Sequence, residues 1–328
     1  MLRVAVVGMG GIGRTHARWY SENEDAELVA VCDLVPERVD PVAEQYGVPA
    51  FHDLRHLIAS AEFDAVSVAT AGPENGGHHY EPTMALLEAG KHVLVEKPIS
   101  NDITQAREMV QTAKDRGLLL GVNLNHRFTP AAQRAKQLQT DGDLGDVLFV
   151  NMALWINNPN ESSPWFHLRA LHPHSIDVMR YFAGPISKVQ AFCHKGPGRT
   201  IWSNASINVQ FASGAVGHLT GSYDASGFHP IERCEVAGGN GRFVIENVFE
   251  RLEFFPRRSP EKLVVDNPIM GGMEGFGQTF KNRIDRFVEQ VQVGGPLDAS
   301  GEDGLAAQEV IEAAIRSFQG GTVEEVAG

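Results

Sequence analysis

The sequence predicts an α/β protein that begins with a doubly wound parallel sheet. Three observations predict this fold class. Apolar, strand-like runs alternate with helical segments through the first 123 residues. A glycine-rich turn joins the first of these runs to the first helix. The chain has 328 residues and is 43% hydrophobic, so it can bury the cores of two medium-sized domains.

The strand-like runs are short and rich in β-branched residues, which is typical of strands buried on both faces. In chain order they are 2–7 (LRVAVV), 27–32 (ELVAVC), 64–70 (DAVSVAT), 92–96 (HVLVE) and 117–123 (GLLLGVN). Parallel strands need a crossover connection, and a helix is the usual one.

Each strand-like run except the last is followed by a helical segment. Pro36 can occupy the first turn of the second helix, and Gly47 can end it. The helical segments are 15–23, 36–46, 82–90 and 103–116.

The bulk composition argues against several classes of partner. The formal net charge is −13, whereas nucleic acids and anionic membrane surfaces bind basic proteins. No apolar stretch is long enough to span a bilayer, and we expect no signal peptide. Cys32, Cys193 and Cys234 are far apart, so we expect no disulfide framework and a reducing cytoplasm.

The turn after the first strand carries a dinucleotide-binding pattern. Gly8, Gly10 and Gly13 have the spacing G-x-G-x-x-G. The first allows a tight turn, the second lets a pyrophosphate approach the backbone, and the third lets the helix pack closely on the strand. Phosphates then lie at the helix N-terminus, where free N–H groups and the helix dipole favour an anion. We expect Gly11 and Ile12 to contribute to the same site.

Asp33 lies at the end of the second strand-like run, twenty residues after Gly13. A carboxylate there can accept hydrogen bonds from both ribose hydroxyls of NAD, and it would repel the additional phosphate of NADP. The combined pattern therefore predicts a Rossmann domain that binds NAD in preference to NADP.

The strand-like run at 92–96 leads into Glu96-Lys97-Pro98. An ammonium held at that point can donate to a substrate oxygen and stabilise negative charge as a hydride moves. A proline directly after the lysine restricts the backbone and helps to aim the side chain. The alternative for Lys97 is an ordinary solvated strand end.

These features together resemble the Gfo/Idh/MocA oxidoreductase family over the whole chain. The resemblance implies a Rossmann domain at 1–123, followed at 124–328 by an α+β domain with an open, mostly antiparallel sheet that serves substrate binding and oligomerisation. It also implies a homodimer or homotetramer. The segments that carry it are the glycine turn, Asp33, the loop Thr70–Pro73, AGKHVLVEKP (89–98), NHRFTPAAQRAK (125–136), LGDVLFV (144–150), HSIDVMRYFAG (174–184) and PLDASGEDGLAAQEVIEAAIRS (296–317).

The resemblance also implies roles for individual residues. Lys97 would face the nicotinamide, and its bond to Pro98 is often cis in the family. His174 would be the acid/base group, since a neutral imidazole near pH 7 can take the proton of a hydroxyl. Further candidates for cofactor contact are Thr70, Pro73 and Glu96, and candidates for substrate contact are His79, Arg127 and Asp177.

The active-site segment departs from the family pattern at two positions. An aspartate is common four residues before the histidine, where this chain has Ala170, and a glycine two residues before it, where this chain has His172. Asp177, which shares a helix face with His174, could orient the imidazole instead. Alternatively, Arg169 and His172 form a different substrate wall, or the reaction is not ordinary alcohol oxidation. Arg169 would suit a substrate carboxylate or phosphate, or it is a surface charge.

A metal site is the alternative interpretation of the histidines in this segment. His167, His172 and His174 would need carboxylate or cysteine partners from elsewhere in the chain. The family resemblance does not require a metal, so we expect core or substrate-wall histidines and no metal.

Two further features bear on the substrate. Trp155, Trp165 and Tyr223 could stack on a sugar or cyclitol ring, or they could lie in the core. The loop at 72–82 is about two residues longer than the family pattern, which either reshapes substrate access or is neutral.

The sequence therefore predicts an NAD-dependent oxidoreductase that acts on a CH–OH group of a sugar, sugar acid or cyclitol, with Lys97 and His174 as catalytic residues. One alternative is an enzyme that uses tightly bound NAD transiently for elimination or glycoside cleavage. The other is a non-catalytic dinucleotide-binding sensor, against which the presence of both residues counts.

Overall fold

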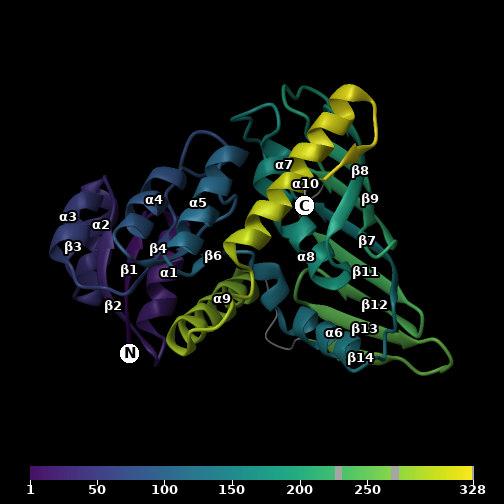
Figure 1. The fold of residues 1–328 in the computed structure, drawn as a ribbon, viewed down its shortest axis with the longest axis horizontal. Coiled ribbons are helices and arrows are strands. Elements are labelled where there is room, and N and C mark those ends of the chain that lie inside the picture. Colours follow the sequence, from purple (N-terminus) through teal and green to yellow (C-terminus); the bar gives the residue numbers. More distant parts are fainter. Residues whose placement is uncertain (226–230, 267–272, 327–328) are drawn as a thin grey trace. The chain divides into compact units, whose positions relative to one another are not determined.

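The computed structural model describes residues 1–225, 231–266 and 273–326, and the chain forms two compact units (Figure 1). Unit 1 comprises Met1–Leu124 and Phe280–Leu305, and unit 2 comprises Asn125–Thr279 and Ala306–Gly328. The first boundary lies one residue beyond the predicted division between 123 and 124. The segment 280–305, which the sequence analysis placed in the second domain, lies in unit 1.

Unit 1 contains a six-stranded parallel sheet in the order β3-β2-β1-β4-β5-β6. The direction of winding reverses between β1 and β4, and open α/β sheets bind ligands at such a point. The predicted doubly wound sheet is thereby confirmed, with β3 as an additional short strand. The strands are β1 (Leu2–Val7), β2 (Ala26–Cys32), β3 (Ala50–Phe51), β4 (Ala65–Val68), β5 (His92–Val95) and β6 (Leu120–Val122).

Helices connect these strands and cover the sheet (Figure 1). Pro36 occupies the first turn of α2, and Gly47, with φ of +66°, ends it as predicted. Asp53 and Asp102 cap α3 and α5 by accepting backbone N–H groups. The helices are α1 (Gly11–Ser21), α2 (Pro36–Tyr46), α3 (Leu54–Ser60), α4 (Tyr80–Glu88) and α5 (Ile103–Asp115).

The second half of α9 (Met273–Val293) belongs to unit 1 because it completes the core of that unit. Phe287 is fully buried among residues of β1, β2 and α1. The side chain of Arg283 is also fully buried and donates to the carbonyl oxygens of Val122 (3.2 Å) and Ala299 (3.1 Å). These contacts join positions far apart in the chain. A single domain boundary in the sequence therefore cannot assign this part of α9 to unit 1.

Unit 2 contains a nine-stranded sheet in the order β14-β13-β12-β11-β7-β10-β9-β8-β15. Among the described residues, only the β7–β10 pair is parallel, which confirms the mostly antiparallel sheet. The strands are β7 (Val147–Trp155), β8 (Ile186–His194), β9 (Asn204–Phe211), β10 (Val216–Ser222), β11 (Glu232–Gly238), β12 (Gly241–Glu246), β13 (Arg251–Pro256), β14 (Leu263–Asp266) and β15 (Glu324–Glu325).

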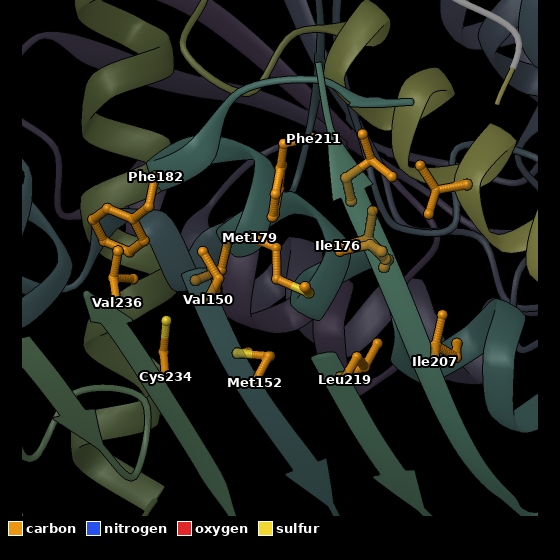
Figure 2. Close-up of a cluster of buried hydrophobic side chains, with 14 of the residues drawn as sticks. Val150, Met152, Ile176, Met179, Phe182, Ile207, Phe211, Leu219, Cys234 and Val236 are labelled. Carbon is orange, nitrogen blue, oxygen red and sulfur yellow. The ribbon is translucent and has the colours of Figure 1, made fainter. Parts of the chain in front are cut away.

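Helices of unit 2 pack on one face of this sheet. Met179 and Phe182, three residues apart on α8, share a buried cluster with Val150 and Met152, which alternate along β7 (Figure 2). In the described part of the chain, no helix is both long enough and apolar enough to cross a membrane. The helices of unit 2 are η1 (Asn125–Phe128), α6 (Pro130–Thr140), α7 (Phe166–Leu171), α8 (Pro173–Ala183) and most of α10 (Gly301–Gly320).

Candidate active site

The turn between β1 and α1 has the shape that a dinucleotide phosphate needs. Gly8 has φ of +93°, and a Cβ there would lie 2.6 Å from the carbonyl oxygen of Ala69. A Cβ on Gly13 would lie 1.6 Å from the Gly8 carbonyl oxygen, so only glycine lets helix and strand approach this closely. By contrast, apart from adjacent residues and the backbone of α1 itself, no described atom lies within 4 Å of a Cβ on Gly10 or Gly11. The N-terminus of α1 is therefore open to an anion.

The carboxylate of Asp33 is fixed by two backbone N–H groups. Its Oδ2 accepts from Met9 (2.6 Å), and its Oδ1 accepts from Val35 (2.9 Å). Each oxygen keeps a second lone pair, so the side chain can still accept from ribose hydroxyls. Ile12 and Pro73, two other predicted cofactor residues, are exposed and thus accessible to a ligand. These residues and the glycine turn fit NAD.

Lys97 lies just beyond the carboxyl end of β5 and is joined to Pro98 by a cis peptide bond. Its side chain is partly buried. Burial lowers the pKa of the ammonium, and the carboxylate of Glu96 opposes this shift. Lys97 is therefore not a fully solvated strand end.

Glu96 takes part in a chain of buried hydrogen bonds that the sequence analysis missed. Its Oε1 lies 3.0 Å from Nε2 of His16 and also accepts from the amide of Asn123. Nδ1 of His16 lies 3.0 Å from Oγ of Ser67. Burial alone would raise the pKa of Glu96, but His16, Lys97 and Asn123 together bring it below its usual value. The chain of hydrogen bonds keeps an anion directly before Lys97.

The loop after β4 closes around a buried histidine. Nδ1 of His79 donates to the carbonyl oxygen of Pro98 (2.7 Å), and the hydroxyl of Thr70 donates to the carbonyl oxygen of His78. A Cβ on Gly77 would lie 2.4 Å from the His79 ring, so a glycine at this position leaves space for the ring. His79 is only 5% exposed. Its position suits an anchor between the loop and Pro98 better than the predicted substrate contact.

In unit 2, His174 lies in the first turn of α8 and is 7% exposed. Its imidazole stacks on that of His126 from η1, with centroids 4.1 Å apart and planes 3° from parallel. Nδ1 of His126 lies 2.7 Å from Oε2 of Glu232 on β11, and both of these side chains are buried. The sequence analysis did not foresee His126 or Glu232 because neither belongs to the segment around His174.

Asp177, one turn after His174, pairs with Arg127 of η1. Nε of the guanidinium donates to Oδ2 at 2.8 Å, and a second nitrogen donates to Oδ1. Both side chains are buried, and the bidentate geometry fixes them relative to each other. The structure thus joins two predicted substrate residues in one ion pair, whereas one of the sequence interpretations had Asp177 orient His174.

Arg169 of α7 has a partner that neither sequence interpretation included. Its guanidinium donates to both carboxylate oxygens of Glu312 on α10, at 2.7 and 2.9 Å. The two side chains are about one-fifth exposed, at 21% and 18%. Since Glu312 already offsets its charge, Arg169 joins two helices of unit 2 and does not have the environment of a substrate anion site.

His167 and His172 form a buried pair. Their Nε2 atoms lie 3.0 Å apart, and Nδ1 of His172 lies 3.0 Å from Oγ of Ser175. A Cβ on Gly221 would lie 2.0 Å from Nε2 of His172, so glycine is needed beside the pair. Burial lowers the pKa of His167 to about 3 and that of His172 well below its usual value. Because His172 has no exposed surface, its predicted contact with substrate does not agree with the structure.

This pair predicts a loss of stability in mild acid. Below about pH 6.5 the unfolded chain binds a proton on each of the two histidines, whereas the folded chain holds both neutral. The free energy of unfolding should therefore decrease as the pH is lowered. The two residues should contribute a loss of about 2–3 kcal/mol between pH 6 and pH 5. Urea unfolding measures it. The double variant His167→Gln/His172→Gln should flatten the profile, and exposed His194→Gln should not; equal slopes in all three proteins would contradict the prediction.

The ranges that the structure describes contain no group of three or more His, Cys, Asp or Glu side chains arranged to bind a metal. His167 and His172 contact each other, and His174 stacks on His126. The geometry therefore gives no support to the alternative of a histidine metal site.

Two of the three candidate aromatic residues have core partners. Trp165 stacks on Trp202, with ring centroids 5.8 Å apart. Tyr223 is 3% exposed and packs against Phe166. Trp155, partly buried at the end of β7, remains a candidate for substrate contact.

Comparison with known proteins gives matches over both units. Two family models match, one described as the oxidoreductase family, NAD-binding Rossmann fold (residues 2–124), and one as the GFO/IDH/MocA C-terminal domain (residues 132–244). Inositol 2-dehydrogenase of Rhizobium meliloti (strain 1021) is 28% identical over 330 residues, which cover 96% of each chain. D-glucoside 3-dehydrogenase of Escherichia coli (strain K12) is 38% identical over 148 residues, 44% of this chain and 41% of that one.

A solved structure shows the same fold. Levoglucosan dehydrogenase in complex with NADH and levoglucosan superposes with a TM-score of 0.88 at 23% identity, over 100% of both chains. The two family models together span most of the sequence and confirm the predicted NAD-binding oxidoreductase. This chain therefore belongs to the Gfo/Idh/MocA oxidoreductase family.

Proposed function

We propose that this protein is an NAD-dependent dehydrogenase or reductase for a secondary alcohol or ketone of a sugar, sugar acid or cyclitol. The observation that carries the proposal is Lys97, partly buried beyond the end of β5 and directly after an anionic glutamate. Relatives named inositol 2-dehydrogenase and D-glucoside 3-dehydrogenase support this substrate class. When NAD(H) is bound, its nicotinamide ring accepts or donates the hydride.

Lys97 would stabilise the reacting oxygen. A preorganised ammonium donates to the alcohol oxygen and favours the negative charge that develops there as hydride leaves the carbon. Partial burial strengthens this interaction because less water competes for the oxygen. Glu96, hydrogen-bonded to His16, provides a fixed negative charge behind the ammonium.

His174 would move the proton. A neutral imidazole accepts the proton of the hydroxyl during oxidation and returns it during reduction. Its stack on His126 restricts the orientation of the ring. Trp155 at the end of β7 and the guanidinium of Arg127, which the buried Asp177 holds in place, are proposed to contact the polar substrate.

The test is a cofactor-reduction screen with polyols, inositols and aldonates, followed by the corresponding ketones with NADH. We expect at least one compound to change the nicotinamide absorbance with saturation kinetics. NAD that co-purifies and is never consumed would instead favour transient use for elimination or glycoside cleavage, an alternative that Ala170 in place of the family aspartate keeps open. Tight NAD binding without any reaction would support a sensor.

The carboxylate of Asp33 predicts a preference for NAD(H) over NADP(H). Loss of the ribose contacts and repulsion of the added phosphate should weaken NADP(H) binding by roughly 2–3 kcal/mol, or ~10²-fold. Fluorescence titration of the protein with both reduced cofactors measures this difference. Asp33→Asn, which keeps the shape and removes the charge, should narrow it, and equal or tighter NADP(H) binding by the unmodified protein would refute the prediction.

We further propose that the protein forms a homodimer or homotetramer. Three large apolar side chains on the nine-stranded sheet are more than half exposed: Leu148 (54%), Phe192 (60%) and Val216 (53%). An oligomer would cover such surface. We also propose a cytoplasmic location, where the three free cysteines would stay reduced.

A further inference from the structure

His174 lacks the carboxylate that the family commonly places four residues before it. In this chain that position is Ala170, which is 7% exposed and packs in an apolar cluster with Phe166, Leu171 and Tyr223. An imidazole that accepts a proton becomes a cation, and a buried cation is costly unless a negative charge lies nearby. The chain therefore needs another source of negative charge.

Glu232 provides a carboxylate from a different element. It is 3% exposed on β11, and its Oε2 lies 2.7 Å from Nδ1 of His126. Because an ionised carboxylate only accepts hydrogen bonds, the Nδ1 nitrogen of His126 carries the proton. This bond fixes the plane of the His126 ring, which lies parallel to that of His174 at 4.1 Å.

We propose that His126 and Glu232 are positioning residues for His174, and that Glu232 supplies through His126 the negative charge that Ala170 cannot. The proposal rests on the proposed function, in which His174 is the acid/base group. During oxidation the hydroxyl proton moves to His174 and the hydride moves to the nicotinamide. His126 and Glu232 exchange no proton with the substrate. The ring face of His126 is electron-rich, and Glu232 carries a negative charge. Both features stabilise the positive charge of the His174 imidazolium.

Two other charged residues close to His174 or His126 in the sequence offset each other. Arg127 of η1 and Asp177 of α8 pair with each other in a bidentate contact, so their opposite charges largely offset. Glu232, in contrast, is hydrogen-bonded among the described side chains to the imidazole of His126 and not to an arginine or lysine. Its negative charge is therefore available to favour a positive charge on His174.

The direct test is an NMR titration of the His174 imidazole in the full-length protein without cofactor or substrate. Glu232→Gln keeps the size of the side chain and removes its charge, so the His174 midpoint should fall by about one pH unit. The matched control is Glu235→Gln, three residues along β11, whose carboxylate pairs with Arg242. It should leave the midpoint unchanged. An unchanged midpoint in Glu232→Gln would overturn the proposal.

A second variant keeps the stacked ring without leaving a buried charge. His126→Phe/Glu232→Gln retains an aromatic face over His174 and should show the same lowered midpoint. On a substrate found by the screen, both variants should lose ~10-fold in kcat with the KM for NAD unchanged, and the acidic limb of the pH–rate profile should move to lower pH. If His126 and Glu232 had a purely structural role, the variants would lower the midpoint of thermal unfolding without moving the acidic limb of the pH–rate profile. That result would count against the proposal.

The two proposals can fail separately. A lowered His174 midpoint in a protein that oxidises no compound supports the coupling and removes the proposed function. Dehydrogenase activity with a normal midpoint and an unshifted acidic limb in Glu232→Gln supports the function and overturns the role of Glu232.

Discussion

Replacing His174 with alanine is expected to lower turnover by ~10²–10⁴-fold, with NAD affinity nearly unchanged. The imidazole occupies the first turn of α8, stacked on His126, and it is the group proposed to carry the hydroxyl proton. The glycine turn and Asp33 belong to unit 1, so the substitution leaves the proposed cofactor contacts intact. Steady-state turnover and NADH fluorescence titration provide the two measurements.

The matched control for this experiment is His194→Ala. His194 is an exposed histidine at the end of β8 in the same unit, and its removal should change neither turnover nor NAD affinity. If His174→Ala retains turnover comparable to that control, another group carries the proton and the assignment of His174 is wrong.

Lys97→Met is expected to lower turnover by ~10²–10³-fold and to leave NAD binding nearly intact, which is the usual cost of losing one preorganised donor. Methionine has a similar length and no charge, so the variant removes the ammonium while preserving most of the packing around Glu96. Single-turnover measurement of hydride transfer separates this effect from product release.

Lys91→Met is the control on the same segment. Lys91 precedes β5 at its opposite end, and its ammonium donates to the carbonyl oxygen of Phe63 at 2.7 Å. The variant should lose some stability with normal turnover. Normal turnover in Lys97→Met as well would return that lysine to the role of a strand-end charge.

Much of unit 1 could be predicted because its signals are local. Buried parallel strands appear in the sequence as short apolar runs, and the Gly8–Gly13 turn and Asp33 belong to consecutive elements. The strand Ala50–Phe51 and the helix Leu54–Ser60 were missed, because a two-residue strand and a two-turn helix are too short to show a recognisable hydrophobic periodicity.

The partners of the candidate catalytic residues could not be predicted in the same way. His126 and Glu232 come from η1 and β11, and only the folded sheet brings them together. His16 had a signal, since it lies on the face of α1 that also carries Gly13, but a single histidine on a helix face is usually a core residue. The pairing of Arg169 with Glu312 also depends on a long-range contact.

The return of the chain to unit 1 after residue 279 affects the order of events during synthesis. Phe287 and its neighbours complete the core around β1 and α1, yet the ribosome makes them more than 150 residues after β6. Until then, the nascent Rossmann sheet exposes an apolar face that α9 will cover. Unit 2 also finishes late, because it includes Ala306–Gly328. Neither unit can complete its core until these late segments have been made, so both units need a longer stretch of nascent chain than a simple division at residue 124 would require.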